Sequence, residues 1–407
     1  MLFVFLSLHS LIIDIFIAER EEFTITTESN EFHIYSTRKQ ESIRTEYLTV
    51  STNSSNEINI RDSQNSYFID ELEYGKQVII KSETPISLNN ISYSGEFVFS
   101  VGNALVRSAS VAEISDFSPS VRNESLYLTE STTPIDSYEK PFYQIKAINR
   151  IGLEDYVAGV IAPEIGGNAP LEAMKAQAVA TRTYTMARLI NNNHKIDGFD
   201  LCSSTHCQVY RGLNGQTNQS KRAALETANL ILMYENQPIE AFYSSTCGGI
   251  SEFSGNLWSV QHPYLTAKPD YYCINIDAMP SWSRRNINWE RNFTTGELED
   301  IFSIRNIRDI QINKVNSSMR IEEVLIKSKD DDIFITGQYR LRDTFGLPSS
   351  LFIIQKDRNN VKFIGNGHGH GVGMCQIGAI VRASKGYDFR EILEFYYENA
   401  EIIMENR

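Results

Sequence analysis

The sequence predicts an α+β fold in which short strands and helices mix around a central cleft, with a β-rich N-terminal region. Residues 20–110 alternate apolar and polar positions in short runs that are separated by polar turns. Residues 170–190 instead repeat apolar side chains at three- and four-residue spacing, which predicts a long helix. With 407 residues, 42% of them hydrophobic, the chain can bury a sizeable core.

The first residues are mostly apolar up to Ala18, although they include His9 and Asp14. This run is too short to span a membrane comfortably and resembles the apolar core of a signal peptide. We therefore expect residues 1–19 to be a signal peptide or an N-terminal anchor. The alternative is a buried N-terminal strand or helix. The first interpretation predicts an exported protein in the periplasm, in the cell wall or anchored at the outer side of the membrane.

Three further regions follow along the chain. Residues 20–110 form the β-rich region, with runs such as 78–80 and 97–99. Residues 111–140 are rich in Ser, Thr, Asp and Glu and predict a linker or loop. We expect residues 141–407 to form the functional domain.

Helix signals are strongest in that last region. Asn168, Ala169 and Pro170 form a typical helix entry, and the helix should end near Ile190. The patterns also predict short helices at about 153–161, 219–229, 296–303 and 388–398, and strands at 143–148, 231–235, 239–244, 309–315, 319–327, 333–337 and 351–355.

The formal net charge is −13. An acidic chain gains no electrostatic attraction toward a phosphate backbone, so we expect no nucleic-acid partner.

The five cysteines are too few for a disulfide framework in a chain of this length. His194, Cys202, His206 and Cys207 lie within fourteen positions of one another. Imidazoles and thiolates are good zinc ligands, but this spacing is not that of a standard zinc finger. A metal site, a Cys202–Cys207 disulfide and free buried thiols remain three open interpretations.

A glycine-rich segment, residues 365–373, contains His368 and His370. No Lys-Ser or Lys-Thr pair follows, so the segment is not a phosphate-binding loop. Its glycines allow either a close approach to a ligand or a tight turn. His370 is accordingly a candidate ligand-binding residue or a structural residue of that turn.

Four sequence blocks, in this order and at these separations, resemble the stage II sporulation protein D family (SpoIID domain), which includes the LytB-like amidase enhancers. They are residues 153–164 leading into 173–184, then 204–212, 241–249 and 369–379. The resemblance covers roughly residues 142–405. Cys375 stands where the family usually has serine, and Ile165 where it usually has methionine.

The resemblance implies a peptidoglycan lytic transglycosylase that cleaves glycan strands after N-acetylmuramic acid. The muramic acid's own 6-hydroxyl would attack the anomeric carbon, so Glu164 alone could serve as general acid and base and no cofactor is required. We expect Glu164 to precede a helix N-terminus, which would favour its ionised form, while apolar neighbours oppose it. The alternative is a non-catalytic glycan-binding activator of an N-acetylmuramoyl-L-alanine amidase.

The resemblance also proposes further site residues. It implies a structural zinc held by His194, Cys202 and Cys207, with His206 as an additional candidate. Gln177 and Arg182 could bond sugar acetamido groups, and Tyr243 and Trp258 could stack on sugar rings or belong to the core. We expect Tyr184 to be a core residue. The candidate substrate-binding residues are Lys175, Gln177, Arg182, Tyr243, Trp258, His370 and Gln376.

Overall fold

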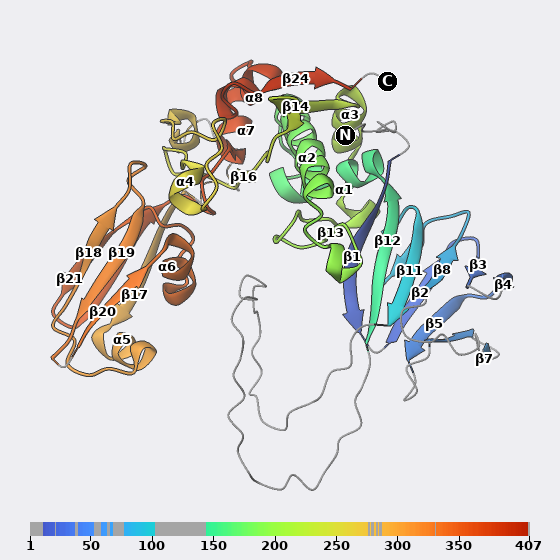
Figure 1. The fold of residues 1–407 in the computed structure, drawn as a ribbon, viewed down its shortest axis with the longest axis horizontal. Coiled ribbons are helices and arrows are strands. Elements are labelled where there is room, and N and C mark those ends of the chain that lie inside the picture. The colour runs from blue at the N-terminus through green and yellow to red at the C-terminus, as the bar shows by residue number, and fades with distance from the viewer. Residues whose placement is uncertain are drawn as a thin grey trace, which may run out of the picture. The chain divides into compact units, whose positions relative to one another are not determined.

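The computed structural model describes residues 11–20, 22–36, 40–52, 58–62, 66–67, 77–101, 144–275, 277, 281, 284, 287–329 and 331–405. It is a mixed α+β protein with a strand-rich N-terminal part, as the sequence predicts (Figure 1). Two compact units divide the chain: one runs to Pro163 and includes Arg188–Gln216, and the other comprises Glu164–Ala187 with Thr217–Asn406. The predicted linker, 111–140, lies outside the described residues.

The first unit contains two sheets, whose strands pair antiparallel except for β1 with β13, which pair in parallel. Their strands show the expected alternation of burial: in β2, Phe23 and Ile25 are buried whereas their neighbours face solvent. The ring centroids of Phe23 and Phe99 lie 5.9 Å apart, so the two inner faces pack on each other. One sheet has the order β13 (Leu201–Cys202), β1 (Ile12–Arg20), β12 (Ile145–Gly152), β11 (Glu96–Val101), β8 (Gln77–Lys81), β3 (Glu31–Tyr35) and β4 (Gln40–Arg44); the other has the order β10 (Ile91–Tyr93), β9 (Ile86–Leu88), β2 (Glu22–Thr27), β5 (Tyr47–Thr52), β6 (Ile58–Asp62) and β7 (Ser66–Tyr67).

Strand β1 occupies an interior position in the first sheet, between β12 and β13 (Figure 1). Ile13 and Ile15 are buried, and Asp14 forms an ion pair with Arg150 of β12 at 2.7 Å. Residues 12–20 thus form a strand with two buried isoleucines, which is the expected alternative of an N-terminal strand; a signal peptide or anchor over residues 1–19 stays a prediction. Residues 1–10 lie outside the described residues.

Helix α1 (Leu153–Ile165) follows β12 directly, and α2 (Leu171–Asn191) begins after a short turn. The start of α2 matches the helix entry predicted at Asn168-Ala169-Pro170. Its burial extends around the whole helix, including Gln177, Thr181 and Arg182, so it is a core helix rather than a surface helix with one apolar stripe. Because β12 and α1 as far as Pro163 belong to the first unit, whereas Glu164 begins the second, the boundary between units falls inside the predicted 141–407 domain.

The second unit surrounds α2 with short elements. Strand β14 pairs with β15 and with the last strand, β24, and β16 pairs with β23 in parallel. These elements are α3 (Asn218–Glu226), β14 (Leu230–Tyr234), β15 (Gln237–Pro238), β16 (Tyr243–Ser244), α4 (Ser254–Leu257), β23 (Met374–Cys375), α7 (Gln376–Ser384), α8 (Phe389–Tyr396) and β24 (Glu401–Met404).

Between α4 and β23 the described residues form two three-stranded sheets with helices beside them. A separate apolar core, which includes Phe345, Phe363 and Leu298, holds this part together. Its elements are β17 (Asn288–Thr294), α5 (Thr295–Phe302), β18 (Asp309–Val315), β19 (Ile321–Lys327), β20 (Asp332–Thr336), α6 (Gln338–Phe345), β21 (Phe352–Asp357) and β22 (Asn360–Asn366). Among the helices of the described ranges, none is long and apolar enough to cross a membrane.

Candidate functional site

Glu164 lies in the last turn of α1, and its side chain is half-buried. It therefore precedes α2 in the chain but does not sit at the start of a helix. The expected position just before a helix N-terminus is therefore wrong, because Glu164 lies at the C-terminal end of α1 and α2 begins only at Leu171. Pro163, one residue before it, is inside the same helix.

Two glutamines from distant blocks of the sequence meet in the interior. Gln376 Nε2 donates to Gln177 Oε1 at 3.2 Å, and Gln177 Nε2 donates to Thr181 Oγ1 at 3.2 Å. Gln177 is fully buried and Gln376 nearly so. The structure thus brings together two predicted site residues, and their amides satisfy each other across α2 and α7.

Two other predicted sugar-binding side chains are engaged in the fold. Arg182 is fully buried and donates to the carbonyl oxygens of Leu230 and Ala224. This position argues against a direct sugar contact, because its guanidinium group does not reach solvent. Lys175 lies between Glu172 and Glu226, with Nζ–O distances of 2.8 and 2.7 Å.

The aromatic candidates divide into two groups. Tyr184 is buried, as expected, and packs edge-on against Phe242. Trp258 is half-buried and packs against Phe242 in a tilted arrangement, with ring centroids 4.3 Å apart. The Trp258 ring also lies 5.6 Å from the His370 ring. Phe242, Trp258 and His370 form a contiguous group, which we call the aromatic cluster. Tyr243, half-buried at the start of β16, is the next residue after Phe242.

The hydrogen bonds of His370 define its protonation. The Val372 backbone N–H donates to Nδ1 at 3.0 Å, so Nδ1 carries no proton. Burial lowers the pKa of His370 to about 3, and the cations Arg342 and Arg320 lower it further, against a hydrogen bond with the Tyr243 backbone. The imidazole is therefore neutral at physiological pH and cannot serve as a general acid there.

This shift predicts a pH dependence of stability. The pKa of His370 is lowered from 6.5 to about 3 on folding, so between these values the unfolded chain binds more protons. The stabilisation is complete above pH 6.5 and is lost as the pH falls toward 3. We expect the denaturation midpoint of wild type to fall more between pH 7 and pH 5 than that of His370→Asn. Equal decreases in the two proteins would contradict this assignment.

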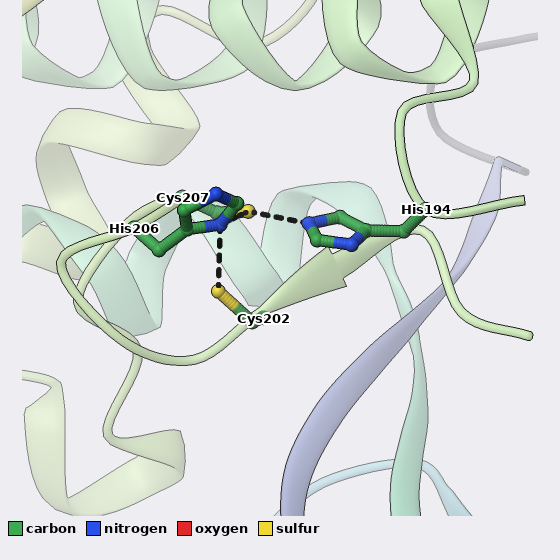
Figure 2. A group of neighbouring side chains, drawn as sticks. All are labelled: His194, Cys202, His206 and Cys207. Atoms are coloured by element: carbon green, nitrogen blue, oxygen red, sulfur yellow. Dashed lines mark hydrogen bonds between the residues drawn. The ribbon is translucent and has the colours of Figure 1, made fainter. Parts of the chain in front are cut away.

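The predicted cysteine–histidine cluster is assembled in the first unit (Figure 2). The ligand atoms of His194, Cys202, His206 and Cys207 all lie within 4.8 Å of one another. His194 Nε2 is 3.3 Å from Cys207 Sγ, and His206 Nδ1 is 3.6 Å from Cys202 Sγ. The two sulfurs are not joined in a disulfide.

The surroundings of this cluster fit a metal ion. His194 donates its Nδ1–H to the Asp197 carboxylate at 2.9 Å, which turns Nε2 toward the sulfurs. The pKa of Cys202 is lowered to about 3, chiefly because the Cys207 thiol donates to it, with further donation from His206 and Ser204, against burial. Two nitrogens and two sulfurs are a common structural zinc set.

The sheet positions the cluster. Cys202 belongs to β13, where it pairs with Phe16 of β1 in parallel register. Phe199 stacks on Phe16, with centroids 4.9 Å apart, and lies 4.6 Å from the His194 ring. Strand β1 therefore supports the loop that carries the cluster.

Sequence reasoning missed a buried carboxylate, Glu252, whose exposed fraction is 0%. It accepts hydrogen bonds from five donors. Two precede the segment from β17 to β22, and three lie within it: Phe253 N and Asn256 Nδ2, then Asn316 Nδ2, Ser318 Oγ and Gln338 Nε2. No charged residue flanks Glu252 in the sequence, so no local pattern predicts that its carboxylate is buried and accepts several hydrogen bonds.

Comparison with known proteins identifies two matching families. The model of the stage II sporulation protein family matches residues 143–234, and that of a domain of unknown function (DUF8618) matches residues 281–373. An uncharacterised protein of Brachyspira hyodysenteriae is 32% identical over 263 residues, which are 64% of this chain and 69% of the relative.

Two relatives from Bacillus subtilis carry functional names. The stage II sporulation protein D is 28% identical over 63% of this chain and 76% of its own length. The amidase enhancer is 29% identical over 59% of this chain, but only 39% of the enhancer's own length is covered.

Proposed function

The chain belongs to the stage II sporulation protein D family, and from this we propose that it is a peptidoglycan lytic transglycosylase with Glu164 as its single general acid and base. The observation that carries the proposal is the position of Glu164. It is a half-buried carboxyl group at the end of α1, inside the segment matched by the family model.

In the proposed reaction, protonated Glu164 transfers its proton to the glycosidic oxygen as the bond from the anomeric carbon of N-acetylmuramic acid breaks. The 6-hydroxyl of the same sugar forms the new bond to that carbon and gives its proton to the Glu164 carboxylate. The carboxyl group is thereby regenerated, and no water is consumed. One carboxyl suffices because the nucleophile is already tethered, whereas glycoside hydrolysis commonly needs two.

We assign glycan contact to the aromatic cluster and Tyr243. Sugar rings stack on half-buried aromatic faces, and neutral His370 offers no charge that would have to be desolvated. Gln177, Gln376, Arg182 and Lys175 fit better as positioning residues, because their polar groups are bound within the fold.

The decisive experiment is incubation of the purified chain alone with peptide-free glycan strands, followed by mass spectrometry. Anhydromuramic ends are the expected product. Reducing ends would indicate hydrolysis. Absence of cleavage on strands that the protein binds would remove the enzymatic proposal.

The second candidate is a glycan-binding activator of an N-acetylmuramoyl-L-alanine amidase, favoured by the similarity to the Bacillus subtilis amidase enhancer. This function predicts faster release of stem peptides when the chain is added to a cell-wall amidase, without anhydromuramic ends. Both candidates place the protein outside the cytoplasm, where its glycan substrate lies, and need no nucleic acid.

We further propose that His194, Cys202, His206 and Cys207 hold a structural zinc ion. Bound zinc would tie His194, His206 and Cys207 to Cys202 of β13 and would take no part in glycan cleavage. We expect Cys202→Ser to lose one equivalent of zinc by elemental analysis and to lower the thermal denaturation midpoint. Thr205→Ser, in the same loop, is the control. A wild-type protein with a Cys202–Cys207 disulfide and no zinc would contradict the proposal.

A further inference from the structure

A second group of metal-ligating side chains lies in the second unit, and the proposed function does not use it. Cys247, Asp270, Cys273 and Cys375 are all 0% exposed, and their ligand atoms lie within 4.8 Å of one another. They come from three separate parts of the chain: the turn after β16, the 3-10 turn at Tyr271–Ile274, and the N-cap of α7. We call this group the three-cysteine site.

Backbone amides point at two of the sulfurs. Gly249 N–H donates to Cys273 Sγ at 3.0 Å, while the N–H groups of Cys247 and Gly378 each donate to Cys375 Sγ at 3.3 Å. Hydrogen bonds from N–H groups stabilise thiolates, and a helix N-terminus such as that of α7 does the same. The backbone is thus arranged for negatively charged sulfur in a site that is closed to water.

Buried cations also face the site. Arg382 pairs with the Asp270 carboxylate at 3.2 Å. Arg320 is 1% exposed and donates through Nη2 to the carbonyl oxygens of Cys247 and Ile250. Its Nε and Nη1 have no hydrogen-bond partner among the described residues. A buried guanidinium group with unsatisfied N–H groups needs nearby negative charge.

Asp270 is held in a fixed orientation. Tyr396 donates its hydroxyl to Asp270 Oδ2 at 2.6 Å, and Cys247 Sγ lies 3.8 Å from the same oxygen. A Cβ at Gly378 would come within 2.2 Å of this oxygen and 2.0 Å of the Tyr396 hydroxyl, so only glycine fits there. Second-shell partners of this kind orient the ligands of metal sites.

We propose that Cys247, Cys273, Cys375 and Asp270 bind a structural zinc ion in a closed site of three sulfurs and one oxygen. Four buried donors, mostly soft thiolates and with no open position, match the preferences of structural zinc. On binding, the three thiols release their protons to solvent, and no electron transfer is involved. The ion would join α7 and the 3-10 turn to the segment that follows β16. The inference is independent of the proposed function.

The rival outcome is a Cys247–Cys273 disulfide, because these two sulfurs are 3.2 Å apart. That bond would form by exchange with an external disulfide and would leave Cys375 as a free thiol. A disulfide would not explain why two backbone N–H groups donate to Cys375 Sγ, and it would place no negative charge beside the Nε and Nη1 groups of Arg320. Zinc binding uses all four ligands, and the three cysteine thiolates that hold the ion place negative charge beside Arg320.

The test uses the full-length double variant C202S/C207S, in which the first cluster cannot bind metal. Elemental analysis after dialysis should find one zinc per chain, and adding Cys273→Ser should remove it. Replacing zinc with cobalt in the double variant identifies the ligands without a further mutation. The absorption spectrum is expected to show strong sulfur-to-cobalt charge-transfer bands and the d–d bands of tetrahedral cobalt. A double variant that binds neither metal, or peptide mapping that finds Cys247 linked to Cys273, would overturn the proposal.

Discussion

Glu164→Gln is expected to stop the formation of anhydromuramic ends while glycan binding and the denaturation midpoint stay close to wild type. Glutamine keeps the shape and the hydrogen-bonding capacity of the side chain but has no transferable proton. General acid–base catalysis by one positioned group contributes about 10²- to 10⁴-fold, and no second carboxyl group replaces it in the proposed reaction. Single-turnover cleavage of peptide-free strands, followed by mass spectrometry, measures this loss.

Glu154→Gln is the matched control, because Glu154 lies in the first turn of the same helix, α1. It should cleave at the wild-type rate. Cleavage by Glu164→Gln at an unchanged rate would show that another group transfers the proton. A Glu164→Gln protein that still accelerates a cell-wall amidase, with a wild-type chain that makes no anhydro ends, would favour the activator.

Glu252→Ala is expected to cause a large loss of stability. Removing the carboxylate leaves five hydrogen-bond donors without their acceptor and takes away one of the anions beside buried Arg320. Breaking a buried charged network of this kind costs about 3–5 kcal/mol. Chemical denaturation, followed by fluorescence, measures the change in the free energy of unfolding.

Glu323→Ala provides the comparison for Glu252. Glu323 also accepts two side-chain hydrogen bonds, from Asn313 and Thr336, but it does so at the surface of β19. Solvent replaces those bonds, so the midpoint should move far less. Similar shifts of the denaturation midpoint in the two variants would mean that the buried hydrogen bonds of Glu252 do not stabilise the fold more than surface hydrogen bonds do.

The sequence predicted best the elements whose signals are local. Helix α2 carries its own entry signal at Asn168-Ala169-Pro170 and was expected at about 170–190, against the observed Leu171–Asn191. Strand β18 was expected at 309–315, as observed. Helix α6 was missed because its N-cap is Gly337, whose position offers no side-chain cap and no sequence signal.

Site residues that lie close together in the sequence were likewise predicted better than those brought together from distant segments. The cysteine–histidine cluster could be predicted because its members are close in sequence. The pairing of Gln177 with Gln376, and the grouping of Cys247 with Cys375, depend on contacts between segments more than a hundred residues apart. Arg182 illustrates the converse: its residue type suggested a ligand contact, but burial within α2 assigns its guanidinium group to backbone carbonyls.

The place of β1 limits how the chain can be processed. A protease that cut at Ala18 would remove the partner of β13 and leave β12 with an open edge, on which unpaired amide and carbonyl groups invite pairing with another molecule. The same cut would take away Phe16, on which Phe199 rests beside His194. Any maturation that preserves the first sheet must therefore cleave before Ile12, and a tag or fusion joined at the amino end needs a spacer upstream of that residue.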